Sequence, residues 1–139
     1  MKFKRYLNEG IDLKSLKFEK AKFETDRKIV KVIVNKFDKE WSRDKNFYIG
    51  KGGSGNAIGG RYKMFKEIIE KPEDERKRWL GESPEGNIIV SSVDIDDIGR
   101  ISFGNGRHRY AVLRDLGMKK IPVAMSNKSI KNAKKYGYI

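Results

Sequence analysis

The 139-residue chain contains no cysteine, only one histidine and only three prolines, and it has no long apolar run. Without a thiol, the chain can form neither a disulfide nor a thiolate metal site, which agrees with a cytoplasmic location. No stretch approaches the ~20 apolar residues that a membrane-spanning helix needs. The basic opening Met1-Lys2-Phe3-Lys4 is not followed by the apolar core of a secretory signal. The length suits one compact domain.

Acidic residues are also scarce, because 19 Asp and Glu stand against 32 Lys and Arg, giving a net charge of +13. This excess favours a polyanionic partner such as nucleic acid, a nucleotide or an acidic protein surface, although a basic protein can simply be soluble. The imbalance is strongest from Lys119 to the C-terminus, which holds six lysines and no acid. Ser126 would cap a last helix there, and we expect its lysines to be the residues that contact a nucleic-acid backbone, namely Lys128, Lys131, Lys134 and Lys135.

The most informative stretch is residues 101–125, ISFGNGRHRYAVLRDLGMKKIPVAM. Residues 101–103 are typical of a short strand, and the Gly104-Asn105-Gly106 turn can adopt backbone angles that other residues avoid. A helix is predicted from Arg107, since its apolar residues recur every three or four positions, and Gly117 would end it. A second strand is predicted over residues 121–125. The stretch therefore predicts a strand, a glycine turn, a helix and a strand in succession.

The glycine turn has the composition of a phosphate-binding site. A helix N-terminus presents backbone N–H groups and a partial positive charge to an anion. Arg107, His108 and Arg109 would add side-chain donors, and the glycines would let the backbone come close to the anion. The phosphate-binding candidates of this turn are therefore Asn105, Gly106, Arg107, His108 and Arg109. The alternative is an ordinary strand, turn and helix with solvated arginines.

The segment GRHRYAVLRDLGMKKIPVAM resembles the signature of the ParB/sulfiredoxin-like superfamily: a Gly-x-[His/Arg]-Arg turn, an alanine-bearing helix, a glycine and a Val/Ile-Pro-Val strand. The resemblance implies a mixed α/β (α+β) fold with a small sheet flanked by helices. It also implies that Gly106, Arg107, His108 and Arg109 hold the phosphates of a nucleotide. Members include ATP-using sulfiredoxins, CTP-dependent ParB switches, ADP-dependent serine kinases and ParB-like nucleases. The opening residues 1–10 resemble the starts of tailed-phage proteins, which act in the host cytoplasm.

One departure from the superfamily narrows the activity, because Arg107 stands where sulfiredoxin has its reactive cysteine. Sulfinic acid repair needs a thiol and is therefore excluded. The resemblance leaves phosphotransfer or nucleotide hydrolysis with ATP or another nucleotide and Mg²⁺, and His108 and Arg109 would stabilise the developing charge. The alternative is a DNA-binding module or a ParB-like nuclease that uses the basic surface.

The rest of the chain supplies further candidates. Residues 1–28 are expected to form an arm packed on a domain of residues 29–139. A strand over residues 29–34 would lead into a polar loop that carries Asp38, our candidate catalytic acid, and Glu40. A glycine-rich segment at residues 50–61 lacks the Walker A pattern, so it is either a mobile loop or a lid over the nucleotide. Its residues that could touch an anion are Lys51, Asn56 and Arg61.

Three further elements complete the expectations. Helices are predicted over residues 58–70 and from Pro72 onward, and a strand over residues 87–93. Asp94, Asp96 and Asp97 then cluster before Gly99, with Asp94 and Asp96 as the candidate ligands of a divalent metal. A cluster of this kind also commonly caps a turn.

Overall fold

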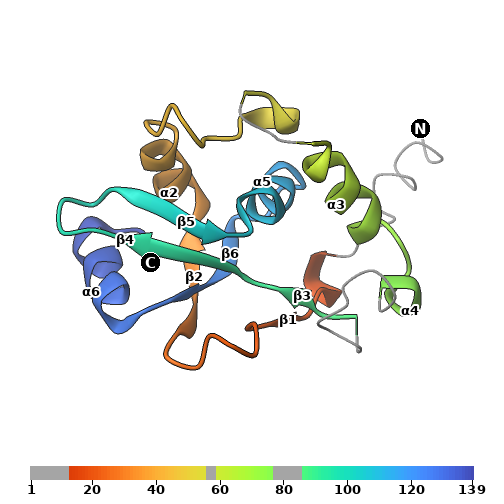
Figure 1. The fold of residues 1–139 in the computed structure, drawn as a ribbon, viewed down its shortest axis with the longest axis horizontal. Coiled ribbons are helices and arrows are strands. Elements are labelled where there is room, and N and C mark those ends of the chain that lie inside the picture. The colour runs from red at the N-terminus through yellow and green to blue at the C-terminus, as the bar shows by residue number, and fades with distance from the viewer. Residues whose placement is uncertain (1–12, 56–58, 77–85) are drawn as a thin grey trace.

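The computed structural model describes residues 13–55, 59–76 and 86–139. Within these residues, a four-stranded sheet has the strand order β2-β6-β4-β5. Its strands are β2 (Lys28–Ile33), β4 (Ser91–Ile95), β5 (Ile101–Asn105) and β6 (Lys120–Met125). The two outer pairs, β2 with β6 and β4 with β5, are antiparallel, whereas β6 and β4 run parallel. A mixed sheet with helices packed on it (Figure 1) confirms the predicted α/β fold class.

The helices come from every part of the described chain. They are α2 (Val34–Trp41), α3 (Arg61–Ile69), α4 (Glu73–Arg76), α5 (Arg107–Asp115) and α6 (Asn127–Tyr136), with short 3₁₀ turns η1 (Leu13–Ser15) and η2 (Lys51–Gly53). Two short strands, β1 (Phe18–Glu19) and β3 (Ile88–Ile89), pair in parallel beside the main sheet. Across the described residues, no helix has the length and apolar character needed to cross a bilayer.

An aromatic cluster joins α2, α5 and β5. Phe37 of α2 lies 5.1 Å from Tyr110 of α5, and Trp41 lies 4.6 Å from Phe103 of β5, measured between ring centroids. Phe37, Trp41 and Tyr110 are almost fully buried. Figure 1 shows α2 and α5 next to each other on the same side of the sheet. Because aromatic side chains bury large areas in well-defined orientations, this cluster sets the position of the α5 N-terminus against β5.

The predicted polar loop after the first strand is wrong, because residues 34–41 form helix α2. Phe37 and Trp41 lie one turn apart and bury their side chains on the sheet, while Lys36 and Lys39 face solvent. The spacing of Val34, Phe37 and Trp41 is the i, i+3, i+7 pattern of an amphipathic helix, which outweighs the polar residues between them.

Most other predicted elements are confirmed with shifted bounds. The strand over residues 29–34 is β2, and the helix expected from residue 58 begins at Arg61, with Ile58 outside the described residues. The strand expected over residues 87–93 is split at Val90 into β3 and β4. The last helix is capped as predicted, since the N–H of Ser129 donates to Ser126 Oγ at 3.2 Å. Of the N-terminal arm expected over residues 1–28, the structure describes only residues 13–28.

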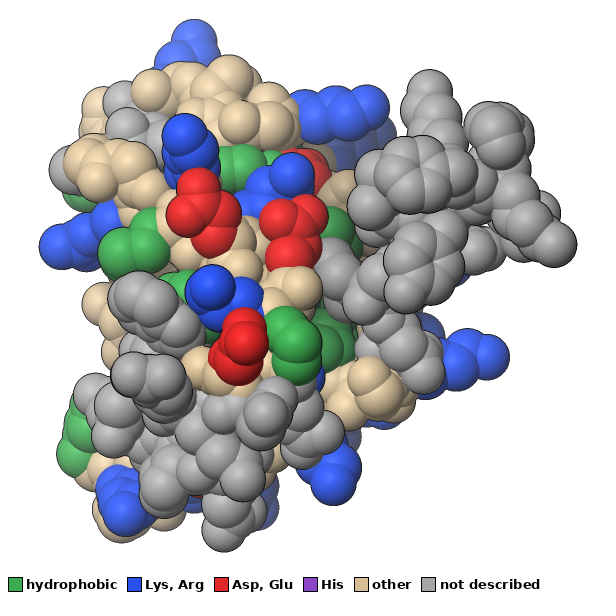
Figure 2. All heavy atoms as spheres, turned by 90° about the vertical axis from the view of Figure 1, so that its right-hand side faces the viewer, with side chains coloured by type: hydrophobic (Ala, Val, Ile, Leu, Met, Phe, Trp, Pro, Cys, Tyr) green, Lys and Arg blue, Asp and Glu red, His purple; other side chains and the backbone are tan. Residues whose placement is uncertain are grey.

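The surface is not uniformly basic despite the net charge. Figure 2 shows the face of the molecule on the α3 side, where acidic side chains lie next to basic ones among the coloured residues.

Candidate phosphate-binding cleft

The turn between β5 and α5 is closely packed around a glycine in the left-handed conformation. Gly106 is the N-cap of α5 and has φ +78° and ψ 16°, in the left-handed region. Ser91 Oγ donates a 2.6 Å hydrogen bond to the Gly106 carbonyl, which pulls the turn against β4. A Cβ at this position would lie 2.7 Å from Ser91 Oγ, 2.7 Å from Arg109 Nη2 and 2.9 Å from Ser91 Cα. The first turn of α5 is therefore held directly against the sheet.

Two arginines of this first helical turn are anchored to neighbouring segments. Arg109 Nε donates to the Ile89 carbonyl at 2.9 Å, and its Nη2 lies 3.4 Å from Asn105 Oδ1. Arg107 Nη1 donates to the Phe47 carbonyl at 2.9 Å, and its guanidinium lies 5.6 Å from the centre of the Phe47 ring. A guanidinium carries five N–H donors, so one arginine can contact both the protein and an anion.

A cleft of about 430 Å³ opens beside the turn. It is lined by residues 102–109, by Asp44 and Phe47 from the segment after α2, and by Arg61 from the start of α3. The cleft thus gathers residues from three parts of the chain that are far apart in sequence. Its size is in the usual range for a small-molecule site.

Positive charge is crowded around this cleft. The pKa of His108 is lowered from its usual value by burial and then by the charges of Arg107, Arg61 and Arg109. Burial and the neighbouring Arg61 likewise lower the pKa of Arg107, with Asp44 acting in the opposite direction. Such mutual repulsion is relieved when an anion enters.

Asp44 is the one carboxylate among the described residues that line the cleft. Its Oδ1 accepts the N–H groups of Asn46 at 3.1 Å and Phe47 at 3.2 Å. These bonds close the turn that brings Phe47 over the cleft. Asp44 therefore shapes the wall of the site and places a carboxylate next to the arginines.

Asp38, our candidate catalytic acid, does not line the cleft. Its carboxylate accepts a 2.7 Å hydrogen bond from Tyr48 Oη and lies 3.0 Å from Arg114 Nη1 and 3.4 Å from Tyr110 Oη. Burial, together with the hydrogen bond to Asp38, raises the pKa of Tyr48 to about 12. These contacts tie α2 to α5 and to the segment before η2, which is a structural role.

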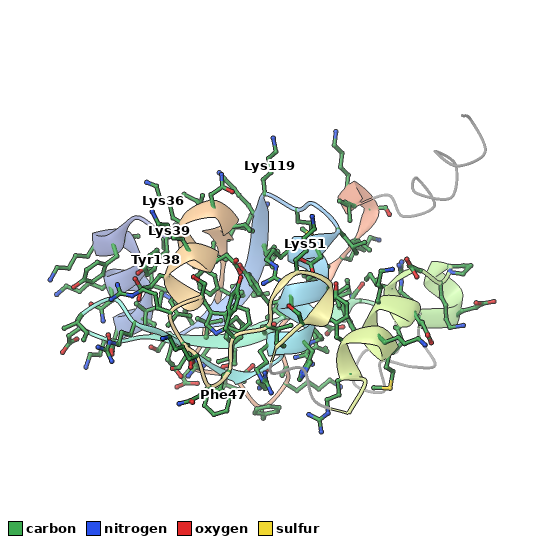
Figure 3. All side chains as sticks on the ribbon, turned by 90° about the horizontal axis from the view of Figure 1, so that it is seen from above. Lys36, Lys39, Phe47, Lys51, Lys119 and Tyr138 are labelled. Atoms are coloured by element: carbon green, nitrogen blue, oxygen red, sulfur yellow. The ribbon has the colours of Figure 1, made fainter. Side chains whose placement is uncertain are left out.

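Lys51 lies at the far end of α5 from the glycine turn. The backbone N–H of Gly52 donates to Asp115 Oδ2 at 2.9 Å, and Tyr62 Oη donates to the same oxygen at 2.6 Å. Because α5 rises 1.5 Å per residue, these contacts are roughly 12 Å from its N-terminus. Figure 3 shows Lys51 and Phe47 in different parts of the molecule. Asn56, expected to act with Lys51, lies outside the described residues.

The acidic cluster before Gly99 is divided among separate partners. Asp94 Oδ1 forms an ion pair with Arg27 Nη2 at 2.8 Å. Asp96 Oδ1 accepts the backbone N–H groups of Ile98 at 3.0 Å and Arg100 at 2.9 Å, which closes the β4–β5 turn. No group of three or more His, Cys, Asp or Glu side chains suited to a metal occurs in the described part of the chain.

The lysines expected to contact nucleic acid lie on α6. Its sequence places Lys128, Lys131, Lys134 and Lys135 on exposed positions, and Lys128 Nζ is 3.8 Å from Asp97 Oδ1. None of the four lines the cleft at Gly106. Any contact they make with a polyanion is therefore made on a different surface.

Sequence reasoning missed two groups that complete the site. The first group is Asp44 and Phe47, and Phe47 precedes its partner Arg107 by 60 residues in the sequence. The second group is Ser91 and Ile89, which bind the turn and Arg109 from the neighbouring strands β4 and β3. An exposed aromatic in the Asp-x-Asn-Phe segment was the one available signal for Phe47. No local pattern marks Ser91, since its role depends on the pairing of β4 in the sheet.

No family model matches this chain, and no curated protein and no solved structure matches it either.

Proposed function

We propose that the cleft at Gly106 binds the phosphate groups of a nucleotide, and that the protein belongs with the ParB/sulfiredoxin-like nucleotide-binding proteins. The convergence of Arg61, Arg107, Arg109 and His108 on one cleft, at a helix N-terminus capped by glycine, is the observation that carries the proposal. The GRHR signature adds an independent argument from sequence.

The geometry supports specific roles for the cleft residues. The backbone at Gly106 and the side chains of Arg107 and Arg109 would hold phosphate oxygens, since guanidinium groups match phosphate in a bidentate manner. Arg61 would approach from α3 on the other side. Buried beside these cations, His108 would take up a proton when the phosphate charge arrives.

Phosphotransfer or hydrolysis requires a group to orient the acceptor or Mg²⁺. Asp44 is better situated for this than Asp38, because Asp44 lines the cleft and Asp38 is bound to Arg114 and two tyrosines. Catalysis by such a site would consist of positioning and charge stabilisation. We therefore transfer the acid role from Asp38 to Asp44 within this proposal.

The single histidine makes the proposal directly testable by NMR. The His108 ring resonances are followed from pH 4 to 9 without ligand and with ATP, ADP, CTP or GTP, each with and without Mg²⁺. The pKa of free His108 should lie below its usual value, and nucleotide should raise it. Because binding then favours the protonated imidazole, nucleotide affinity should increase as the pH falls from the bound-state pKa to the free-state pKa.

A matched pair of variants separates the cleft from general basicity. Arg61→Gln should weaken nucleotide binding about tenfold, the effect of losing one charged hydrogen bond. Lys131→Gln removes the same charge from α6 and should leave affinity unchanged. A His108 pKa that no nucleotide moves, or equal losses in the two variants, would show that this cleft is not the nucleotide site.

A further inference from the structure

The phosphate cleft continues into a second hollow along the exposed side of β5. This second hollow, of about 530 Å³, is lined by Ile101 and Arg100 on one side and by residues at 40 and 43–46 on the other. Asp44 and Ser102 line both hollows. The two hollows therefore adjoin at these residues, and we call them together the β5 groove, which extends from Arg100 to Arg109.

The β5 groove is open because β5 is the outer strand of the sheet within the described residues. At about 3.3 Å per residue, the strand makes a floor roughly 17 Å long, which is much longer than one phosphate group. The segment after α2 forms the facing wall, and Arg107 holds that wall in place through its bond to Phe47. The groove is thus suited to an extended chain rather than to a compact ligand alone.

Cations occur along the whole groove. Arg43, Lys45 and Arg100 line the second hollow and extend the positive charge of the cleft. With Arg61, Arg107 and Arg109 of the cleft, six arginines and lysines among the described residues line the two hollows against two carboxylates, Glu40 and Asp44. Glu40 Oε1 lies 3.4 Å from Arg43 Nη1. A polyanion therefore complements the groove over its length.

An exposed aromatic ring, Phe47, lines the first hollow, three residues after the shared Asp44. Phe47 is 56% exposed and packs beside the Arg107 guanidinium. A cationic groove with an exposed aromatic platform is the arrangement by which proteins bind single-stranded nucleic acid, with phosphates on the cations and bases on the rings. An acidic peptide would use the cations but leave the ring without a stacking partner.

We infer that the β5 groove binds a single-stranded nucleic acid, and this inference rests on the proposed phosphate site. One phosphate occupies the cleft at Gly106, a base stacks on Phe47, and the phosphates on one side contact Lys45 and Arg100. The ligand of the cleft is then a nucleic-acid strand, and a free nucleotide mimics one unit of this strand. The α6 lysines, which line neither hollow, make no part of this site.

The experiment measures fluorescence anisotropy of a labelled 12-nucleotide single strand, DNA and RNA in turn, over a series of salt concentrations. The wild type should bind, and the double variant Lys45→Gln/Arg100→Gln should bind about tenfold more weakly. The slope of the logarithm of the binding constant against the logarithm of the salt concentration should be smaller by about 1.4 in the double variant, because two phosphate contacts are lost. The same double variant should bind ATP as the wild type does. Both side chains are exposed, and a melting temperature equal to that of the wild type checks the fold.

The matched control is Lys131→Gln/Lys134→Gln, which removes two charges from α6 and should leave strand binding unchanged. Equal losses in the two double variants, equal affinity for duplex and single strand, or displacement of the strand by an acidic peptide would each overturn the inference. Strand binding that depends on Lys45 and Arg100 without any ATP binding would keep the groove and refute the proposed nucleotide function. ATP binding without strand binding would keep the proposed nucleotide function and refute the inference about the β5 groove.

Discussion

Replacing Gly106 with alanine tests whether the close approach of the α5 N-terminus to β4 is what forms the cleft. The residue has φ +78°, and a non-glycine residue in that region costs about 1–2 kcal/mol. The added Cβ would also lie 2.9 Å from Ser91 Cα, a backbone atom of β4 that cannot move without disturbing the sheet. Overpacking of this kind costs typically 1–3 kcal/mol. We expect Gly106→Ala to lower the free energy of unfolding by about 2–5 kcal/mol in total.

Gly60→Ala is the matched control for this substitution. Gly60 is the N-cap of α3 with φ +70° and ψ 12°, nearly the same conformation as Gly106. A Cβ there meets no atom of the described residues within 4 Å. The control should therefore cost only the conformational part, about 1–2 kcal/mol.

Urea unfolding followed by far-UV circular dichroism measures both variants against the wild type. The difference between them isolates the contact with Ser91 and should be about 1–3 kcal/mol. Under conditions where it is still folded, Gly106→Ala should also lose nucleotide binding, because the turn before α5 is altered. Gly60→Ala leaves the turn before α5 unchanged. Equal unfolding free energies in the two variants would refute the claim that the turn is held by its approach to β4.

Two further substitutions test the contacts that hold α5 and α6. Asp115→Asn should cost about 2–3 kcal/mol at neutral pH, because Asp115 accepts hydrogen bonds from Tyr62, Gly52 and Arg114 and an amide cannot accept all three. These donors lower the pKa of Asp115, outweighing burial, so its contribution is present above about pH 4 and is lost as the pH falls through the lowered pKa. Urea unfolding at pH 7 and pH 3 should thus show a smaller difference at pH 3, and a constant difference would contradict the charge-based explanation. Ser129→Ala removes the acceptor of the buried Ile95 N–H, a 3.0 Å bond, and should cost about 1–2 kcal/mol by thermal unfolding, whereas exposed Lys128→Ala should cost almost nothing.

In helix α2, the burial of apolar side chains outweighs the polar residues that favour a loop. Polar residues between Val34 and Trp41 suggested a loop, yet the apolar residues at helical spacing decided the structure, because burying Phe37 and Trp41 outweighs the preferences of solvated neighbours. The prediction of Asp38 as a catalytic acid depends on the same expected loop. Once residues 34–41 are helical, its carboxylate points at Tyr48 and Arg114 instead of into the cleft.

The sequence by itself determined the strand, glycine turn, helix and strand of residues 101–125. Those signals are local: a left-handed position requires glycine, and apolar spacing defines the buried face of a helix. Only the tertiary structure decided which distant residues share the cleft. Arg61, Asp44 and Phe47 meet Arg107 because α2, α3 and β5 all pack against α5. No pattern within any one segment encodes a contact that arises from packing between segments.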